Sequence, residues 1–177
     1  TMPWRNGLGS TIELAKHQTH DSFMWRLSMA DVALDGAFSD FSGYDRCLIL
    51  VSGLGMTLSN QQQQWVLKNQ LDSAHFRGED VIDAALHDGP IRDFNIMIRR
   101  KDCKAAVFTS QEQKQQTIPL DGDLFLLFNV QGEASFLVDG GNNQELAEQH
   151  LIQVVPGQKS SCVCSGDAWV GILITYL

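Results

Sequence analysis

Residues 48–58 read LILVSGLGMTL, an apolar run, a glycine and a second short run. Residues 127–137, LFNVQGEASFL, repeat this arrangement, with Gly132 in the position of Gly53. Large and β-branched apolar residues favour strands, and a glycine between two such runs favours a turn. The two glycines are 79 positions apart, which is longer than the common solenoid repeats. The two stretches therefore predict two copies of a β-module, each containing a hairpin.

The rest of the chain continues this pattern. Short β-rich runs separated by Gly, Asp, Asn and Ser recur, and few stretches have a helical period. We expect strands at residues 10–15, 24–30, 47–51, 55–58, 93–99, 105–109, 124–130, 134–138, 150–155 and 168–176. The predicted fold is all-β, with one small antiparallel barrel or sandwich in residues 1–101 and a second in residues 102–177.

Composition and charge argue against several classes of partner. The chain has 177 residues, a net charge of −8 and a pI near 4.9. Nucleic acids and anionic membranes need a cationic surface, so neither is expected as a main partner. No apolar stretch approaches the roughly 20 residues that span a bilayer, and no basic, apolar leader is visible, so a cytoplasmic location is the default expectation. A homodimer is compatible with the sequence.

Histidine and cysteine spacing argues against a metal. Metal sites in small β-barrels commonly use an H-x-H pair, because alternate strand positions point both imidazoles into the barrel. The chain has no H-x-H and no G-x-S-x-G nucleophile motif. Cys162 and Cys164 form a C-x-C pair, which places two reduced thiols on one face of a strand. We therefore predict neither a cofactor nor a metal site.

Two predicted strands each carry an arginine and a small polar residue on one face. In FMWRLSMADV (23–32), strict alternation puts Arg26 and Ser28 on the same side. In DFNIMIRR (93–100), it does the same for Asn95 and Arg99. A barrel of about eight strands can hold one small molecule, so this face is where we expect a ligand.

Arginine and asparagine suit a ligand with a carboxylate and an amide or formyl group. The planar guanidinium matches a carboxylate with two hydrogen bonds, and an asparagine supplies both a donor and an acceptor. Arg46 stands at the start of an apolar run, where a barrel mouth would place a pocket. The predicted ligand-binding residues are Arg46, Asn95, Arg26, Ser28, Trp4, Asn6, Asp45 and Arg99.

Each arginine also has a structural alternative. Arg26 has Asp31 or Asp93 as a candidate partner in an ion pair, and Arg46 has its neighbour Asp45. Ionic residues within β-folds are commonly paired, which favours the structural role for Arg26 and Arg99. The position of Arg46 favours the ligand role. Trp4 serves equally well as a lid or as a core residue, since aromatic side chains dominate both settings.

The first hundred residues resemble the HutD/Ves family. The segments that carry the resemblance are MPWRNGLGSTIELA (2–15), FMWRLSMADV (23–32), DGAFSDFSGYDR (35–46), LILVSGLGMTL (48–58), FRGEDVIDAALHDG (76–89) and DFNIMIRR (93–100). The resemblance implies a bicupin, with two cupin-like antiparallel barrels in one chain. It also implies a link to histidine utilisation, with binding of an intermediate such as N-formylglutamate that modulates the pathway.

These observations lead to one functional hypothesis and two rivals. We expect a metal-free protein that binds a small carboxylate in the N-terminal barrel and acts in regulation. The first rival is a hydrolase or isomerase that uses acid–base chemistry at Asp45, Asp93 or His75. The second rival is a protein-interaction module. Turnover of a bound compound would distinguish the enzyme from the binding protein.

Overall fold

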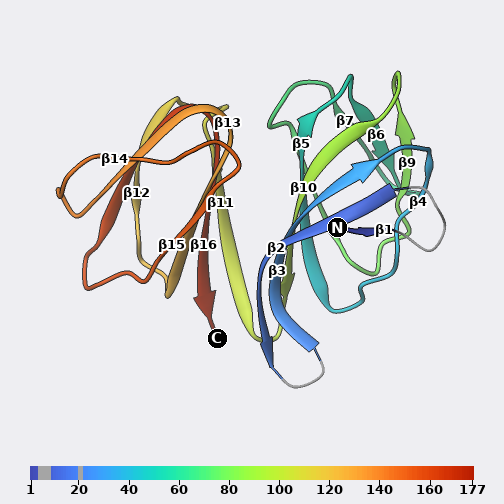
Figure 1. Cartoon of the computed structure of the whole chain (residues 1–177). Helices are drawn as coiled ribbons and strands as arrows, with labels where there is room; N and C mark the ends of the chain where they lie inside the picture. The colour runs from blue at the N-terminus through green and yellow to red at the C-terminus, as the bar shows by residue number, and fades with distance from the viewer. Residues whose placement is uncertain (4–8, 20–21) are drawn as a thin grey trace. The chain divides into compact units, whose positions relative to one another are not determined.

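The computed structural model describes residues 1–3, 9–19 and 22–177. All regular secondary-structure elements in these residues are β-strands. The prediction of an all-β fold is therefore confirmed. The chain divides into two compact units, Thr1–Asp102 and Cys103–Leu177. Every pairing between described strands is antiparallel (Figure 1).

The N-terminal unit contains two sheets. The large sheet has the order β1-β2-β3-β10-β5-β8 and the small sheet has the order β4-β9-β6-β7. The large sheet consists of β1 (Met2–Pro3), β2 (Gly9–Thr19), β3 (Ser22–Val32), β10 (Ile91–Arg99), β5 (Tyr44–Ser52) and β8 (Ser73–Arg77). The small sheet consists of β4 (Gly36–Ala37), β9 (Asp83–Leu86), β6 (Met56–Ser59) and β7 (Gln64–Leu67).

One hydrophobic core joins the two sheets. Leu48 and Leu50 of β5 pack in the same cluster as Met56 and Leu58 of β6, and all four side chains are almost fully buried. Apolar area removed from water stabilises the fold by about 25 cal/mol per Å². The face of the large sheet that carries Leu48 and Leu50 is therefore an interior face.

The stretch 48–58 is not a hairpin, contrary to the prediction. β5 and β6 lie in different sheets, and the chain crosses between them at Gly53. Gly53 has φ = 104°, and a Cβ there would lie 2.7 Å from the carbonyl oxygen of Pro90. Only glycine tolerates this conformation and this close approach, so Gly53 redirects the chain and does not fold it back.

The C-terminal unit is one sheet built on two long strands. β16 and β13 pair along most of their lengths, and the order is β11-β16-β13-β14, with β12 on β16 and β15 on β13. The bounds are β11 (Cys103–Thr109), β12 (Gln115–Pro119), β13 (Leu124–Val138), β14 (Gln144–Glu145), β15 (Leu151–Val154) and β16 (Ser161–Tyr176). Phe125, Leu127 and Trp169 lie in its core.

Gly132 lies inside β13 and does not form a turn between two strands. The register of β13 against β16 shifts between Asn129 and Gln131 and again before Ala134, and Gly132 has φ = 76°. These are the marks of a β-bulge, which bends a strand without ending it. The strands predicted at 124–130 and 134–138 are therefore one strand. The pairings of the described strands close no ring in either unit, so two closed barrels stay a prediction.

Candidate functional site

β3, β10 and β5 lie side by side in the large sheet (Figure 1). Their register brings predicted site residues to one face. Asn95 of β10 lies opposite Ser28 of β3, and Met97 lies opposite both Arg26 of β3 and Arg46 of β5. Directly opposed residues in paired strands share a face, and so do alternate residues of one strand. This is the interior face of the sheet, since Asn95 also lies opposite the core residue Leu48 of β5.

Asp93 belongs to the same face. It lies two residues before Asn95 on β10, opposite Ala30 of β3 and Leu50 of β5. Its side chain is 2% exposed, and those of Arg46 and Asn95 are 7% and 8% exposed. Arg46 was predicted at an open mouth, but the structure buries it. The interior of the N-terminal unit thus holds a positive and a negative charge on one face, where charges are costly unless they have partners.

Four of these side chains have buried polar atoms without a hydrogen-bond partner. In the described part of the chain these atoms are Nε of Arg26, Nε of Arg46, Oδ1 of Asp93 and Oδ1 of Asn95, with one more, Oδ1 of Asn129, in the C-terminal unit. Each unsatisfied buried group costs about 1–3 kcal/mol, and more when it is charged. We use the name ligand face, after the ligand site predicted from the sequence, for Arg26, Ser28, Arg46, Asp93 and Asn95.

Aromatic rings cover the faces of both guanidinium groups. The Cζ atom of Arg46 lies 5.1 Å, 5.5 Å and 5.0 Å from the ring centroids of Phe38, Phe41 and Phe76. The Cζ atom of Arg26 lies 5.7 Å from the Phe41 centroid and 5.2 Å from that of Phe23. Cation–π contacts favour this packing. Contacts with ring faces use no N–H group of a guanidinium, so Nε of each arginine stays without an acceptor, whereas Nη2 of Arg26 donates to Sδ of Met97 at 3.6 Å.

Backbone hydrogen bonds fix the segment that carries Phe38 and Phe41 to the connection between β8 and β9. The N–H of Phe38 donates to the carbonyl of Ile82 at 2.8 Å, and the N–H of Phe41 donates to that of Gly78 at 2.9 Å. The contact at Gly78 is close, because a Cβ there would lie 2.0 Å from the carbonyl oxygen of Phe41. Glycine at position 78 is therefore a condition for placing Phe41 over the two arginines.

We expect Gly78→Ala to displace the Phe41 segment. The added methyl group meets backbone, which cannot give way as a side chain does, so the free energy of unfolding should fall by about 1–3 kcal/mol. Urea denaturation measures this loss. Gly157→Ala is the matched control, because the nearest atom to a Cβ there is the Ser160 hydroxyl at 3.3 Å. Equal stability of the two variants would contradict the assigned role of Gly78.

Burial shifts the pKa values of the charged groups on the ligand face. It raises the pKa of Asp93 to about 7, although attraction to Arg46 opposes the rise. It lowers the pKa of Arg46 to about 10, with Asp93 opposing, and it also lowers the pKa of Arg26. Both arginines stay cationic near neutral pH. Asp93 alone can change its charge there.

The structural ion pairs predicted for the arginines are replaced by others. Asp45 pairs with Arg100 at 2.9 Å and not with its neighbour Arg46, because adjacent strand residues point to opposite faces. Asp45 is thus placed away from the ligand face. Asp31 pairs with Arg92 at 2.6 Å and not with Arg26.

Two further predicted site residues, Trp4 and Asn6, lie outside the described residues. Arg99 donates hydrogen bonds to Asp102 and Ser22 and contacts Thr19 at 3.3 Å. Arg99 therefore has partners within the N-terminal unit, which agrees with the structural role that the sequence favoured for it. Sequence alternation missed the aromatic residues, because Phe38 and Phe41 precede β5 and Phe76 belongs to β8.

The histidine and cysteine residues form no comparable centre. Within residues 1–3, 9–19 and 22–177, no three His, Cys, Asp or Glu side chains are grouped so that they could hold a metal ion. His75 lies opposite Cys47, on the other face of the sheet from Arg46, with 3.6 Å between Nε2 and Sγ. Burial raises the pKa of Cys47 to about 12, so this thiol stays protonated and is a poor nucleophile.

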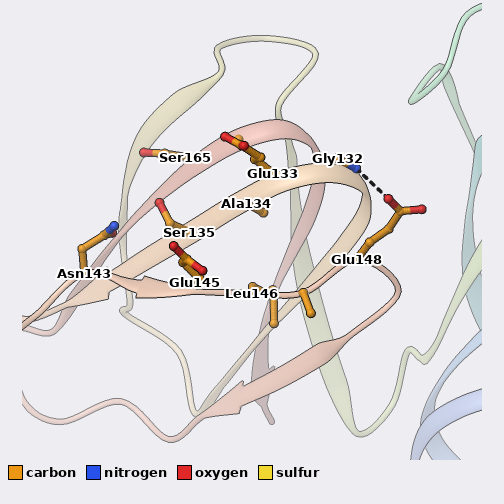
Figure 2. A pocket seen from close by; sticks show the side chains of 11 residues that line it. Gly132, Glu133, Ala134, Ser135, Asn143, Glu145, Leu146, Glu148 and Ser165 are labelled. Atoms are coloured by element: carbon orange, nitrogen blue, oxygen red, sulfur yellow. Dashed lines mark hydrogen bonds between the residues drawn. The ribbon is translucent and has the colours of Figure 1, made fainter.

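The C-terminal unit has an open depression of about 810 Å³ (Figure 2). Three carboxylates line it, from Glu133, Glu145 and Glu148, and Gly132 donates its N–H to Glu148 Oε2 at 3.1 Å. The other lining residues are Ala134, Ser135, Asn143, Leu146, Ala147, Ser165 and Gly166. Among the described residues that line it there is no arginine or lysine, so this lining does not suit an anion.

The sequence matches the HutD family over residues 1–172. The chain belongs to the HutD family. A structure of HutD from Pseudomonas fluorescens SBW25, described under a formate condition, superposes with a TM-score of 0.86 at 30% identity, covering 99% of this chain and 93% of that one. A conserved protein of unknown function from Pseudomonas aeruginosa PAO1 gives a TM-score of 0.83 at 29% identity, with coverage of 98% and 93%.

Curated relatives of this HutD-family chain include Ves proteins. Protein Ves of Escherichia fergusonii is 33% identical over 140 residues, which are 77% of this chain and 67% of that protein. An uncharacterised 21.2 kDa protein in the hutC 3' region of Pseudomonas putida is 40% identical over 98 residues, 54% of this chain. That match spans about half, 52%, of the Pseudomonas putida protein. The resemblance to HutD and Ves is confirmed.

Distant structures show a cupin-like fold. A Cupin 2 conserved barrel domain protein from Leptotrichia buccalis has a TM-score of 0.57 at 10% identity, covering 96% of this chain and 89% of that one. At this identity the likeness concerns the fold alone. In the described residues no helix is long and apolar enough to cross a membrane.

Proposed function

We propose that this HutD-family chain binds a small carboxylate on the ligand face of its N-terminal unit, without a metal. The observation that carries the proposal is a group of four side chains on one face, each with one buried polar atom that lacks a hydrogen-bond partner. Two of these side chains are arginines. Unsatisfied buried atoms are costly, and a ligand that accepts hydrogen bonds from the two arginines would reduce this cost.

A carboxylate is the ligand that fits the arginine edges best. The Phe41 ring lies 5.5 Å from Cζ of Arg46 and 5.7 Å from Cζ of Arg26, and Nε of each arginine lacks an acceptor, so an acceptor would approach the Nε edge. A carboxylate has two oxygens in one plane and accepts two parallel hydrogen bonds from such an edge. The charges agree as well, since two guanidinium groups and one carboxyl group leave a net positive charge for an anion.

The comparisons support a role near histidine utilisation. One relative is described by its position in the hutC 3' region, and the superposed Pseudomonas fluorescens protein is a HutD. We propose that the chain senses a pathway carboxylate and modulates the pathway, with N-formylglutamate as the first compound to test. We also propose that each unit corresponds to one cupin-like barrel, which the distant cupin structures support.

An acid–base enzyme is the second candidate. The observation that favours it is Asp93, a buried carboxyl group with a pKa of about 7 on the same face of the sheet as the arginines that would hold a substrate. A group with such a pKa can exchange a proton at neutral pH. The other residues considered for this role, Asp45 and His75, lie on the opposite face of the sheet from Arg46.

One experiment distinguishes the two candidates. The protein is heated with formate, glutamate, urocanate or N-formylglutamate, and each compound that raises the melting temperature is then incubated with the protein and followed by NMR. We expect at least one carboxylate to stabilise the fold, by about 2.7 kcal/mol at a hundred times its Kd, and to remain unchanged. Consumption of the compound would favour the enzyme. A panel without any stabilising carboxylate would refute the binding proposal.

A further inference from the structure

We infer that Asp93 is a specificity-determining residue that accepts a hydrogen bond from the ligand, so that the site selects carboxylates bearing an N–H or O–H donor. This inference rests on the proposed function, because it concerns the same ligand face. The inference adds a specificity-determining residue and a chemical class of ligand to the proposed function. The class comprises N-acyl amino acids and hydroxy acids, as opposed to carboxylates that offer acceptors only.

The unsatisfied atoms on the ligand face are of two kinds. Arg26 and Arg46 each lack an acceptor for Nε–H, whereas Asp93 and Asn95 each lack a donor for Oδ1. A plain carboxylate has acceptors only, so it would satisfy the arginines and leave both oxygens unpaired. It would also bring a second negative charge towards Asp93, which is unfavourable in a buried site. A ligand with one additional donor satisfies the arginines and one of the two oxygens, and the charged acceptor of the two is Asp93.

The positions along the strands separate the two kinds of atom. Arg26 and Arg46 both lie opposite Met97 of β10. Asp93 lies four residues before Met97 on the same strand, and Asn95 lies between Asp93 and Met97. Alternate residues of a strand are about 6.6 Å apart. The sheet therefore offers donors at one end of the ligand face and acceptors towards the other. A ligand lying along β10 would place its carboxylate at the arginines and its donor near Asn95 and Asp93.

Neighbouring acids already have partners, which leaves Asp93 for the ligand. Asp31 makes two hydrogen bonds to Arg92, at 2.6 Å and 3.1 Å. Glu13, which lies opposite Ser28 on β2, pairs with Lys16 at 3.0 Å. None of the ion pairs between described residues joins Asp93 to Arg46.

A matched pair of ligands tests the inference. N-acetylglycine has a carboxylate and an N–H, and acetoxyacetate has the same shape with an ester oxygen in place of the N–H. Calorimetric titration of both into the full chain at pH 8, where Asp93 is mostly ionised, gives a ratio of affinities. We expect N-acetylglycine to bind about 10- to 100-fold more tightly, the effect of one hydrogen bond to a charged group.

Variants test whether the Asp93 side chain causes the difference in affinity between the two ligands. In Asp93→Ala the ratio should fall to within about threefold, because neither ligand meets the carboxylate. Asp31→Asn is the control on the same sheet, and it should keep the wild-type ratio. A merely structural role of Asp93 would weaken both ligands equally and leave the ratio unchanged, which would overturn the inference.

The remaining outcomes separate this inference from the proposed function. Equal binding of both ligands to the wild type, lost in Arg46→Ala, would overturn the role of Asp93 and leave carboxylate binding in place. If neither acid binds the wild type, and formate and N-formylglutamate also fail, the proposed function is overturned and the inference with it.

Discussion

Replacing Arg46 with alanine is expected to abolish carboxylate binding and leave the fold intact. The guanidinium is buried, covered by three phenylalanine rings and without a hydrogen bond at Nε. Loss of a charged partner from a desolvated site costs on the order of 2–5 kcal/mol, or about 30-fold to several thousandfold in affinity. Calorimetric titration of the carboxylate identified by thermal shift measures this loss.

Two variants make the Arg46 result interpretable. Arg46→Lys keeps the charge but removes the planar fork, so it should weaken binding by about tenfold or more. Arg100→Ala removes an arginine whose partners, Asp45 and Glu79, lie away from the ligand face, and it should bind as the wild type does. If the Arg46→Ala protein bound the carboxylate as tightly as the wild type, or if it were unfolded in the absence of ligand, the role of Arg46 would be structural.

Replacing Asp93 with asparagine is expected to stabilise the protein at high pH. The pKa of Asp93 is raised to about 7, mainly by burial, from an ordinary value of 3.8. The folded state therefore binds this proton more tightly than the unfolded state does, and stability contributed by the protonated form is lost as pH rises from about 4 to about 7. The asparagine side chain has no such titration.

The stability difference between the two proteins should consequently depend on pH. It should be near zero at pH 4 and reach about 2–4 kcal/mol in favour of Asp93→Asn at pH 8, since one pKa unit corresponds to about 1.4 kcal/mol. Denaturation by guanidinium chloride at pH 4, 6 and 8 measures the free energy of unfolding of both proteins. Asp31→Asn is the control, because Asp31 is exposed and paired with Arg92. A constant difference at all three pH values would show that Asp93 does not titrate in this range.

Strand alternation predicted part of the ligand face, because it depends only on local geometry. The period of two placed Arg26 with Ser28, and β3 and β10 pair in a register that brings Asn95 beside them. The aromatic residues could not be predicted this way. Phe38 and Phe41 reach the arginines from the segment before β5, and Phe76 reaches them from β8. These contacts depend on the tertiary arrangement of strands that are distant in sequence.

The glycine motif illustrates why local pattern does not fix connectivity. The apolar runs around Gly53 and Gly132 look alike in sequence, yet the first crosses between two sheets and the second bulges within one strand. Positive φ is common to both glycines, and it permits either outcome. Strand partners decide between them. β6 pairs with β7 and β9 in the small sheet, whereas β13 stays paired with β16 on both sides of its bulge.

The aromatic cover of Arg46 continues to a tryptophan. The rings of Phe76 and Trp65 lie 5.9 Å apart between centroids, and Phe76 in turn lies 5.0 Å from the Arg46 guanidinium. Indole emission responds to the local electric field, and a carboxylate arriving at Arg46 would neutralise the nearest positive charge. Trp169, by contrast, is fully buried in the C-terminal unit. A change in Trp65 emission, measured against the emission of the other three tryptophans, would thus report occupancy of the proposed site.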